Sequence, residues 1–193
     1  MTPDESTTFE RIRNELRALD EAVYVAVAGA QTPTLDLCLR TLSRAADKSV
    51  LWIGVAGAMT VLGGPRARRA ALSGLASIGI ASSTANIVAK QEFHRRRPDR
   101  EAFGVPFARQ VVMPMSTSFP SGHAASAFAF AEGVAVTEPA LGAILRSLAA
   151  AVAYSRVHTG VHYPGDVIAG LLIGMTAGRV GALAVTHLIP DRH

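Results

Sequence analysis

Three short polar clusters contain most of the side chains in this sequence that could do chemistry. They are the stretches Lys90 to Pro98 (KQEFHRRRP), Phe119 to His123 (FPSGH) and Tyr154 to Asp166 (YSRVHTGVHYPGD). Each lies at the end of an apolar segment, in a chain with 49% hydrophobic and 18% charged residues. Polar side chains at membrane depth are costly and therefore usually serve a function. We expect chain reversals to bring the three clusters together in one site.

The cations of these clusters, together with the start of a helix, predict a binding site for phosphate. Lys90, Arg97 and Arg156 supply fixed positive charge. Arginine suits phosphate because its planar guanidinium donates two parallel hydrogen bonds, whereas lysine acts as a point charge. Ser121 and Gly122 directly precede a segment that we expect to be helical, and backbone N–H groups at a helix N-terminus attract anions.

Two histidines and an aspartate could act on the bound phosphate. His162 and Asp166 are four residues apart, with Pro164 and Gly165 between them. We expect Asp166 to cap the following helix and to turn back onto the imidazole, which would fix its tautomer and make the other ring nitrogen a better nucleophile. His123 could give a proton to the leaving oxygen. The set predicts phosphoryl transfer in which one histidine attacks, the other donates a proton and cations stabilise the transferring group.

The elements that must position these residues are predicted to be helices. We expect an all-α integral membrane bundle of about five to six transmembrane helices, preceded by amphipathic helices. Residues 1–48 would form the amphipathic or interfacial helices and 49–193 the membrane-embedded core. The predicted spans cover 49–64, 70–89, about 123–137, 140–154 and 167 to about 189. Residues 91–118, with three prolines, are expected to be a loop with at most short helices.

Two features of the flanking segments affect the topology. Residues 8–28 have apolar side chains at spacings of three and four, which is typical either of a helix in the membrane interface or of one that packs on the rest of the protein. Residues 65–69 are expected to be a short basic loop, which the positive-inside rule would place in the cytoplasm. The three polar clusters would then lie on the extracytoplasmic face.

Composition argues against several other classes of protein. The net charge is +4 and the pI about 9.8, but no basic face interleaved with aromatic residues indicates nucleic-acid binding. The single cysteine, Cys38, excludes an internal disulfide and a cysteine-based zinc site. His158 and His162 have a spacing found in metal sites, but Gly160 and Pro164 disfavour one continuous helix there. We expect no metal and no cofactor, and the sequence does not indicate an oligomeric state.

The order and spacing of the clusters resemble a known signature. The pattern Lys90-x6-Arg97-Pro98, then Pro120-Ser121-Gly122-His123, then Ser155-Arg156-x5-His162-x3-Asp166 is similar to that of the type 2 phosphatidic acid phosphatase superfamily, which also includes vanadium-dependent haloperoxidases. All three parts match, and the resemblance runs from about Ser49 to the C-terminus.

The resemblance implies a role for each matching residue. Phosphate oxygens would be bound by Lys90, Arg97 and Arg156, with Ser121 and Gly122 completing the cradle. His162 would be the nucleophile that forms a phosphohistidine, Asp166 would orient it, and His123 would be the general acid. Members that look like this chain are metal-independent enzymes of the plasma membrane, acting on lipid phosphates from outside the cytoplasm.

The resemblance leaves several functions open. The short loops are most similar to bacterial members that act on polyprenyl phosphates, polyprenyl diphosphates or a polyprenyl-phosphate pentose phosphate in cell-envelope synthesis. Phosphatidic acid or phosphatidylglycerol phosphate is the alternative substrate. A vanadate haloperoxidase would be larger and soluble, and a non-catalytic lipid-phosphate-binding membrane protein would not need every catalytic position. We expect His94, Arg95 and Arg96 to be loop residues that face water or lipid phosphate.

Overall fold

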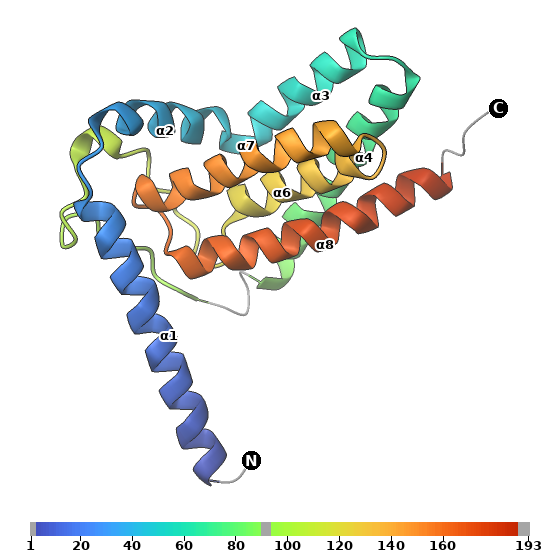
Figure 1. Ribbon diagram of the computed structural model, residues 1–193. Coiled ribbons are helices and arrows are strands. Elements are labelled where there is room, and N and C mark those ends of the chain that lie inside the picture. The colour runs from blue at the N-terminus through green and yellow to red at the C-terminus, as the bar shows by residue number, and fades with distance from the viewer. Residues whose placement is uncertain (1–2, 90–93, 189–193) are drawn as a thin grey trace.

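The computed structural model describes residues 3–89 and 94–188, and within them the chain is helical with no strand (Figure 1). The elements are α1 (Pro3–Gly29), α2 (Pro33–Ala45), η1 (Asp47–Ser49), α3 (Val50–Leu62), α4 (Pro65–Ser83), η2 (Thr84–Ala89), η3 (Phe107–Arg109), α6 (Gly122–Ala135), α7 (Pro139–His158) and α8 (Pro164–Leu188). The all-α prediction is confirmed. In the described part of the predicted loop, η3 is the single short helix, as expected.

Helix α6 is the centre of the bundle, with α4, α7 and α8 packed around it (Figure 1). Every residue from 124 to 134 on this helix is buried. Five of these eleven residues are alanine, and the large ones pack against neighbouring helices, as Phe130 does against Trp52 of α3 with ring centroids 5.5 Å apart. Small side chains let helix backbones approach closely, which suits a bundle whose exterior is lipid.

Glycines on α8 allow its close approach to α6. A Cβ atom at Gly170 would lie 2.4 Å from the carbonyl oxygen of Ser121, and one at Gly174 would lie 2.5 Å from that of Ala125. The contact also aligns the ends of the two helices, because the Ser121 N–H donates to the backbone oxygen of Asp166 at 2.9 Å. Packing inside the bundle therefore sets the distance between the second and third polar clusters.

Fewer helices than predicted are long enough to cross a membrane. Residues Pro65–Ile87, Pro139–His158 and Pro164–Leu188 have the length and hydropathy of a span, and the pair Thr7–Gly29 and Pro33–Ala45, bent by 117°, would make a fourth if counted as one. Helices α3 and α6 have 13 and 14 residues, whereas about 20 cross a hydrocarbon core. By length and composition the described residues therefore hold three to four spans, within the all-helical membrane bundle that the sequence predicted.

The basic segment at 65–69 is part of a helix, so the prediction of a loop there is wrong. Pro65 occupies the first position of α4, where its missing N–H costs nothing, and the turn lies at Gly63 and Gly64 instead. Arg66 donates to the carbonyl oxygen of Thr137 at 2.7 Å and pairs with Glu138 at 3.0 Å. The basic start of α4 thus contacts the α6–α7 connection, at the end of the bundle away from the histidines.

One charged pair lies within the helices. Arg146 of α7 makes two hydrogen bonds to the carboxylate of Glu132 on α6, at 2.6 and 2.9 Å. The two charges therefore pair with each other between helices.

Helix α1 extends away from the bundle, and only its C-terminal turns pack on it (Figure 1). Tyr24 and Ala28 are buried against Val105 of the loop and Val157 of α7. The apolar side chains nearer the N-terminus, including Phe9, Ile12 and Leu16, are at least 50% exposed. The packing interpretation therefore holds for the end of α1, while the interfacial location of its first half stays a prediction.

Candidate active site

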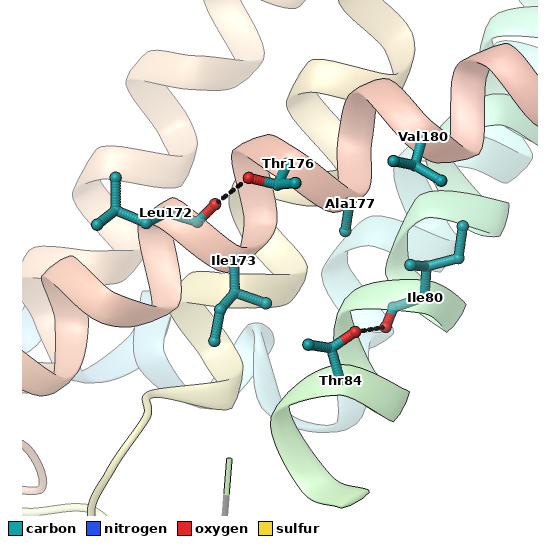
Figure 2. Close-up of a pocket in the computed structure, with 7 residues that line it drawn as sticks. All are labelled: Ile80, Thr84, Leu172, Ile173, Thr176, Ala177 and Val180. Atoms are coloured by element: carbon teal, nitrogen blue, oxygen red, sulfur yellow. Dashed lines mark hydrogen bonds between the residues drawn. The ribbon is translucent and has the colours of Figure 1, made fainter. Parts of the chain in front are cut away.

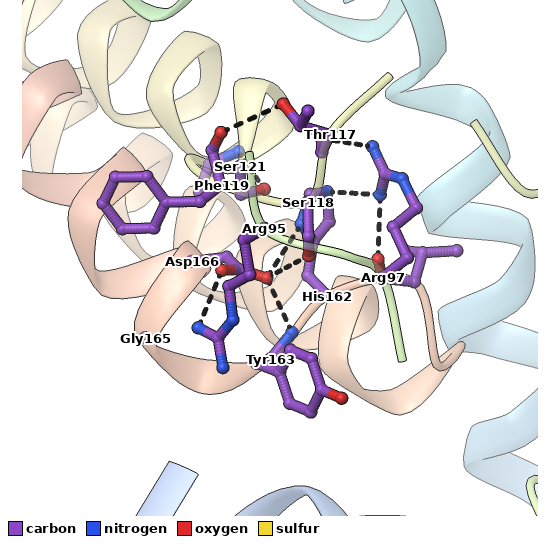
Figure 3. A network of polar contacts seen from close by, with 12 residues as sticks. Arg95, Arg97, Thr117, Ser118, Phe119, Ser121, His162, Tyr163, Gly165 and Asp166 are labelled. Atoms are coloured by element: carbon purple, nitrogen blue, oxygen red, sulfur yellow. Dashed lines mark hydrogen bonds and ion pairs between the residues drawn. The ribbon is translucent and has the colours of Figure 1, made fainter. Parts of the chain in front are cut away.

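The imidazole of His162 is buried in the connection between α7 and α8 (Figure 3). The chain reverses after α7 at Gly160, whose φ of 74° favours glycine. His162 Nδ1 lies 3.5 Å from Asp166 Oδ2, and Nε2 lies 3.2 Å from Arg97 Nη1. Among the described residues, Nδ1 has no hydrogen-bond partner, since 3.5 Å is longer than an ordinary N–H···O bond. A small movement of the ring would bring this nitrogen within hydrogen-bond distance of the carboxylate.

The carboxylate of Asp166 is fully buried and held on both oxygens (Figure 3). Oδ2 accepts a hydrogen bond from the Ser118 hydroxyl and another, at 2.9 Å, from the backbone N–H of Tyr163. The bond from Tyr163, which directly precedes α8, is the backbone half of a capping box. The prediction that Asp166 caps the helix and faces His162 is confirmed.

Arg95 holds the other oxygen of Asp166 and connects it to α1. Its Nη1 donates to Asp166 Oδ1 at 3.0 Å, its Nη2 donates to Asp20 Oδ2 at 2.6 Å, and its guanidinium carbon lies 4.2 Å above the Tyr163 ring. Asp20 Oδ1 in turn accepts from the Gly165 N–H at 2.6 Å. The prediction that Arg95 faces water or lipid is wrong. The sequence shows a run of three arginines, and only the fold reveals which one faces a buried carboxylate.

Arg97 faces His162, but most of its donors are used by the backbone. Its guanidinium donates to the carbonyl oxygens of Ser116 at 2.9 Å, Thr117 at 3.1 Å and Val161 at 2.8 Å. These bonds fix the loop over the turn that carries His162. A phosphate beside His162 would replace the contact between the Arg97 Nη1 and the Nε2 of His162.

Arg156, on the last turn of α7, is a buried cation with a free donor. Its Nη1 donates to the Ser43 hydroxyl at 2.6 Å and lies 3.8 Å from Asp47 Oδ1. Its Nε has no hydrogen-bond partner among the described residues. A buried N–H without a partner is costly, so this atom is suited to donate a hydrogen bond to an oxygen of a bound anion.

Ser121 and His123 begin α6 as predicted, and His123 meets a carboxylate that the sequence did not reveal. The Ser121 hydroxyl caps the helix by accepting from the Ala124 N–H at 3.4 Å, and Gly122 is its first residue. His123 Nε2 lies 2.8 Å from Oδ1 of Asp47, which is in η1. Asp47 has no local sequence signal, because it is 76 residues away from its partner.

Lys90 lies outside the described residues, so its part in the site stays a prediction. His158 lies away from His162: its Nε2 contacts Asp36 Oδ1 of α2 at 2.9 Å. The same carboxylate pairs with Arg109 at 2.8 Å, and Arg109 also donates to the Val27 carbonyl oxygen. This second buried network fixes the loop to the α1–α2 bend.

The surroundings of His162 keep its imidazole neutral. Burial is the main cause that lowers the pKa of His162 to about 4, and the positive charges of Arg97 and Arg156 add to it. Asp166 opposes the shift because its negative charge favours the imidazolium. At neutral pH the ring therefore has a free lone pair, as a nucleophile requires.

An apolar groove lies between α4 and α8, away from the histidines (Figure 2). This groove of about 450 Å³ is lined by Ile80, Thr84, Leu172, Ile173, Thr176, Ala177 and Val180. The hydroxyls of Thr84 and Thr176 donate to the carbonyl oxygens of Ile80 and Leu172, each four residues earlier, as Figure 2 shows. The groove presents no ionisable group, so the chemistry belongs to the histidine site.

Comparisons with known proteins identify the architecture. Residues 70–190 match the PAP2 superfamily. Decaprenylphosphoryl-5-phosphoribose phosphatase of Mycobacterium tuberculosis is 35% identical over 165 residues, covering 82% of this chain and 86% of the relative. The structure of LpxE from Aquifex aeolicus superposes with a TM-score of 0.67 and 25% identity, over 84% of this chain and 94% of that one.

A second solved structure has a similar fold. It is a transmembrane PAP2-type phosphatidylglycerolphosphate phosphatase from Bacillus subtilis, with a TM-score of 0.69 at 24% identity over 93% of this chain and 90% of that one. The family match covers more than half of the chain and includes all three polar clusters. The chain belongs to the PAP2 superfamily, and it is an integral membrane lipid phosphatase of that kind.

Proposed function

We propose that the chain removes the terminal phosphate of a polyprenyl-phosphate-linked sugar phosphate in cell-envelope synthesis, through a phosphohistidine on His162. The mycobacterial relative is named as a phosphatase of a substrate of this kind, decaprenylphosphoryl-5-phosphoribose. It supports this substrate class because the similarity extends over most of both chains. Polyprenyl monophosphates and diphosphates are the other substrates of the same polyprenyl class.

The proposed reaction has two steps. The Nε2 lone pair of His162 attacks phosphorus, the bond from phosphorus to the leaving oxygen breaks, and His123 gives that oxygen a proton. Water then attacks the phosphohistidine, His123 takes a proton from it, and inorganic phosphate leaves with His162 restored. Asp166 would hold the Nδ1 proton throughout.

The orientation of His162 is the observation that carries this proposal. One ring nitrogen faces a buried carboxylate at 3.5 Å and the other faces a guanidinium at 3.2 Å. This arrangement puts the N–H towards Asp166 and the lone pair towards the cations that would hold phosphate. We assign Lys90, Arg97 and Arg156 with Ser121 and Gly122 to phosphate binding, and the unpaired Nε of Arg156 supports that role.

A substrate panel tests the function. The purified chain in detergent should release phosphate from polyprenylphosphoryl 5-phosphoribose faster than from undecaprenyl diphosphate, phosphatidic acid or phosphatidylglycerol phosphate. Because its cations are side chains, activity should persist in excess EDTA. Preference for phosphatidic acid would contradict the substrate class, and loss in EDTA that a divalent metal restores would contradict the mechanism.

We also propose that the site faces the extracytoplasmic side of the plasma membrane. Arg66, Arg68 and Arg69 lie at the start of α4, and the site lies beyond the other end of that helix. The positive-inside rule would place the basic end in the cytoplasm.

Labelling of single cysteines tests this orientation. With Cys38 replaced, Ala102→Cys in the loop should react with an impermeant thiol reagent in intact cells, whereas Gly64→Cys should react only after lysis. Both positions are exposed, so they form a matched pair. The reverse pattern would invert the topology.

A further inference from the structure

A second, smaller pocket opens beside His123. It has a volume of about 190 Å³ and lies between η1, the end of α4 with η2, and the start of α6. Its lining consists of polar and very small side chains: Ala46, Lys48, Ser49, Ser82, Ala85, Asn86, Gly122, His123 and Ser126. It shares no lining residue with the apolar groove between α4 and α8.

The position of this pocket relates it to one part of the substrate. In phosphoryl transfer the attacking and leaving atoms lie roughly in line through phosphorus. With His162 as nucleophile, the leaving oxygen lies on the side of His123, the group that would protonate it. The part of the substrate attached to the leaving oxygen must therefore extend into the space next to His123. The pocket described above is a space of this kind. This step rests on the proposed function.

The chemistry of the lining indicates what kind of leaving group fits. Three serine hydroxyls, an amide and an ammonium group would lose hydration without replacement if a hydrocarbon lay against them. A hydroxyl-bearing group can instead exchange hydrogen bonds with them. The ammonium of Lys48 adds a preference for a leaving group with a negative charge.

The size of the pocket points the same way. A volume of about 190 Å³ is below the roughly 300 Å³ at which pockets for drug-sized ligands begin. It corresponds to about six water molecules at roughly 30 Å³ each. A single sugar ring or a glycerol unit fits this space, whereas a polyprenyl chain does not.

The backbone beside the pocket is unusual. Lys48 and Ser49 have φ angles of 50° and 60°, which non-glycine residues rarely adopt, and here they are consecutive. This turn allows Asp47 to reach His123 while Lys48 and Ser49 line the pocket. Strained backbone of this kind is concentrated at functional sites.

We propose that this pocket is a subsite for the leaving group, and that it takes a hydroxyl-bearing sugar ring whose far side carries a phosphodiester facing Lys48. The serine hydroxyls and Asn86 would bind the ring hydroxyls, while the lipid chain lies outside the subsite. The subsite would favour a phosphate ester of a polar headgroup over a phosphate attached directly to an apolar alcohol.

Selectivity between two substrates tests the subsite. Wild type, Ser82→Leu and Lys48→Gln would be assayed in detergent on polyprenylphosphoryl 5-phosphoribose and on short-chain phosphatidic acid. Each variant should lose about tenfold in kcat/KM on the sugar phosphate, mainly through KM, and should lower the ratio of the two substrates. Ser83→Leu, on the exposed neighbouring position outside the pocket, is the matched control and should leave the ratio within about twofold.

The outcomes separate the subsite from the function. Equal losses on both substrates, or no loss in either variant, would overturn the subsite while the phosphatase activity stands. Wild type that releases phosphate from neither lipid would overturn the proposed function itself. If Ser82→Leu fails to fold, Lys48→Gln on its exposed side chain decides the matter alone, and Lys48→Arg should restore the ratio.

Discussion

The two histidines of the site occupy very different surroundings. His162 is buried and sits among groups that are themselves held: Asp166 with four donors or charges around it, and Arg97 bound to three backbone carbonyls. His123 is partly exposed at the edge of a polar pocket, and its contact in the described structure is Asp47, a carboxylate that is itself half exposed.

This difference matches the different tasks proposed for the two rings. A nucleophile attacks the same atom in every substrate, so one tautomer and one position serve it best. A general acid must meet an oxygen whose attached group differs between substrates. The buried, fixed surroundings of His162 therefore suit a step that is the same for every substrate. The open, polar surroundings of His123 suit a step in which the leaving group differs between substrates.

The largest effect should come from the rigid side. Replacing His162 with alanine removes the covalent route, so turnover should fall by roughly 10⁴-fold or more. No phosphate should remain on the protein after a rapid quench without acid, whereas wild type should carry it on His162 by mass spectrometry. Phosphate found on Ser121 would contradict the mechanism, and phosphate on His123 would exchange the roles.

On the open side the effect should depend on the substrate. His123→Ala should cost roughly 10²- to 10⁴-fold on a lipid alkoxide leaving group, which needs a proton. An activated aryl phosphate needs little proton donation, so its hydrolysis should fall much less. Steady-state rates on both substrates measure the contrast, and equal losses would argue that His123 is not the acid.

A smaller effect is expected from the connection to α1. Arg95→Gln removes a charge partner of Asp166, so kcat should fall about tenfold while KM stays close to wild type, a change of about 1.4 kcal/mol in the barrier. Arg95→Lys should recover part of the rate. Arg96→Gln, on the exposed neighbour, is the control. A rise in KM with an unchanged kcat would indicate that Arg95 acts on the substrate and not through Asp166.

The smallest expected effect is a shift of the pH profile. With a pKa of about 4, His162 is neutral above pH 4, so kcat/KM should fall as the pH drops below that value. Arg97 lowers this pKa, so Arg97→Gln should raise it and move the acid limb upward by less than about one pH unit. The midpoint of the limb is measured, whatever the absolute rate, and a downward shift would contradict the assignment.

The sequence predicted the parts of the site that follow from local rules. Asp166 caps α8 because it stands three residues after Tyr163, and Ser121 caps α6 by the same kind of rule. Each of these inferences needed only spacing and residue type.

The remaining parts depend on tertiary contacts that no spacing reveals. Asp20 and Asp47 reach the site from 145 and 76 residues away in sequence. Their segments look like ordinary amphipathic helix and turn, and the predicted boundary near residue 48, which remains a prediction, gave no reason to expect either. The number of long helices has the same origin, since an apolar run does not reveal where a helix ends: α3 and α6 have 13 and 14 residues.

The glycine at position 170 shows that the alignment of this site depends on a residue that has no reacting group. Even a methyl group there would meet the carbonyl oxygen of Ser121, and α8 would have to move away from α6. Ser121 and Asp166 are joined by one backbone hydrogen bond, so the proposed phosphate-binding residue Ser121 would move away from Asp166 together with the helices. Gly170→Ala should then impair catalysis while every reacting group remains present. Natural variation at such helix contacts would therefore change the alignment of the site without changing any of its reacting groups.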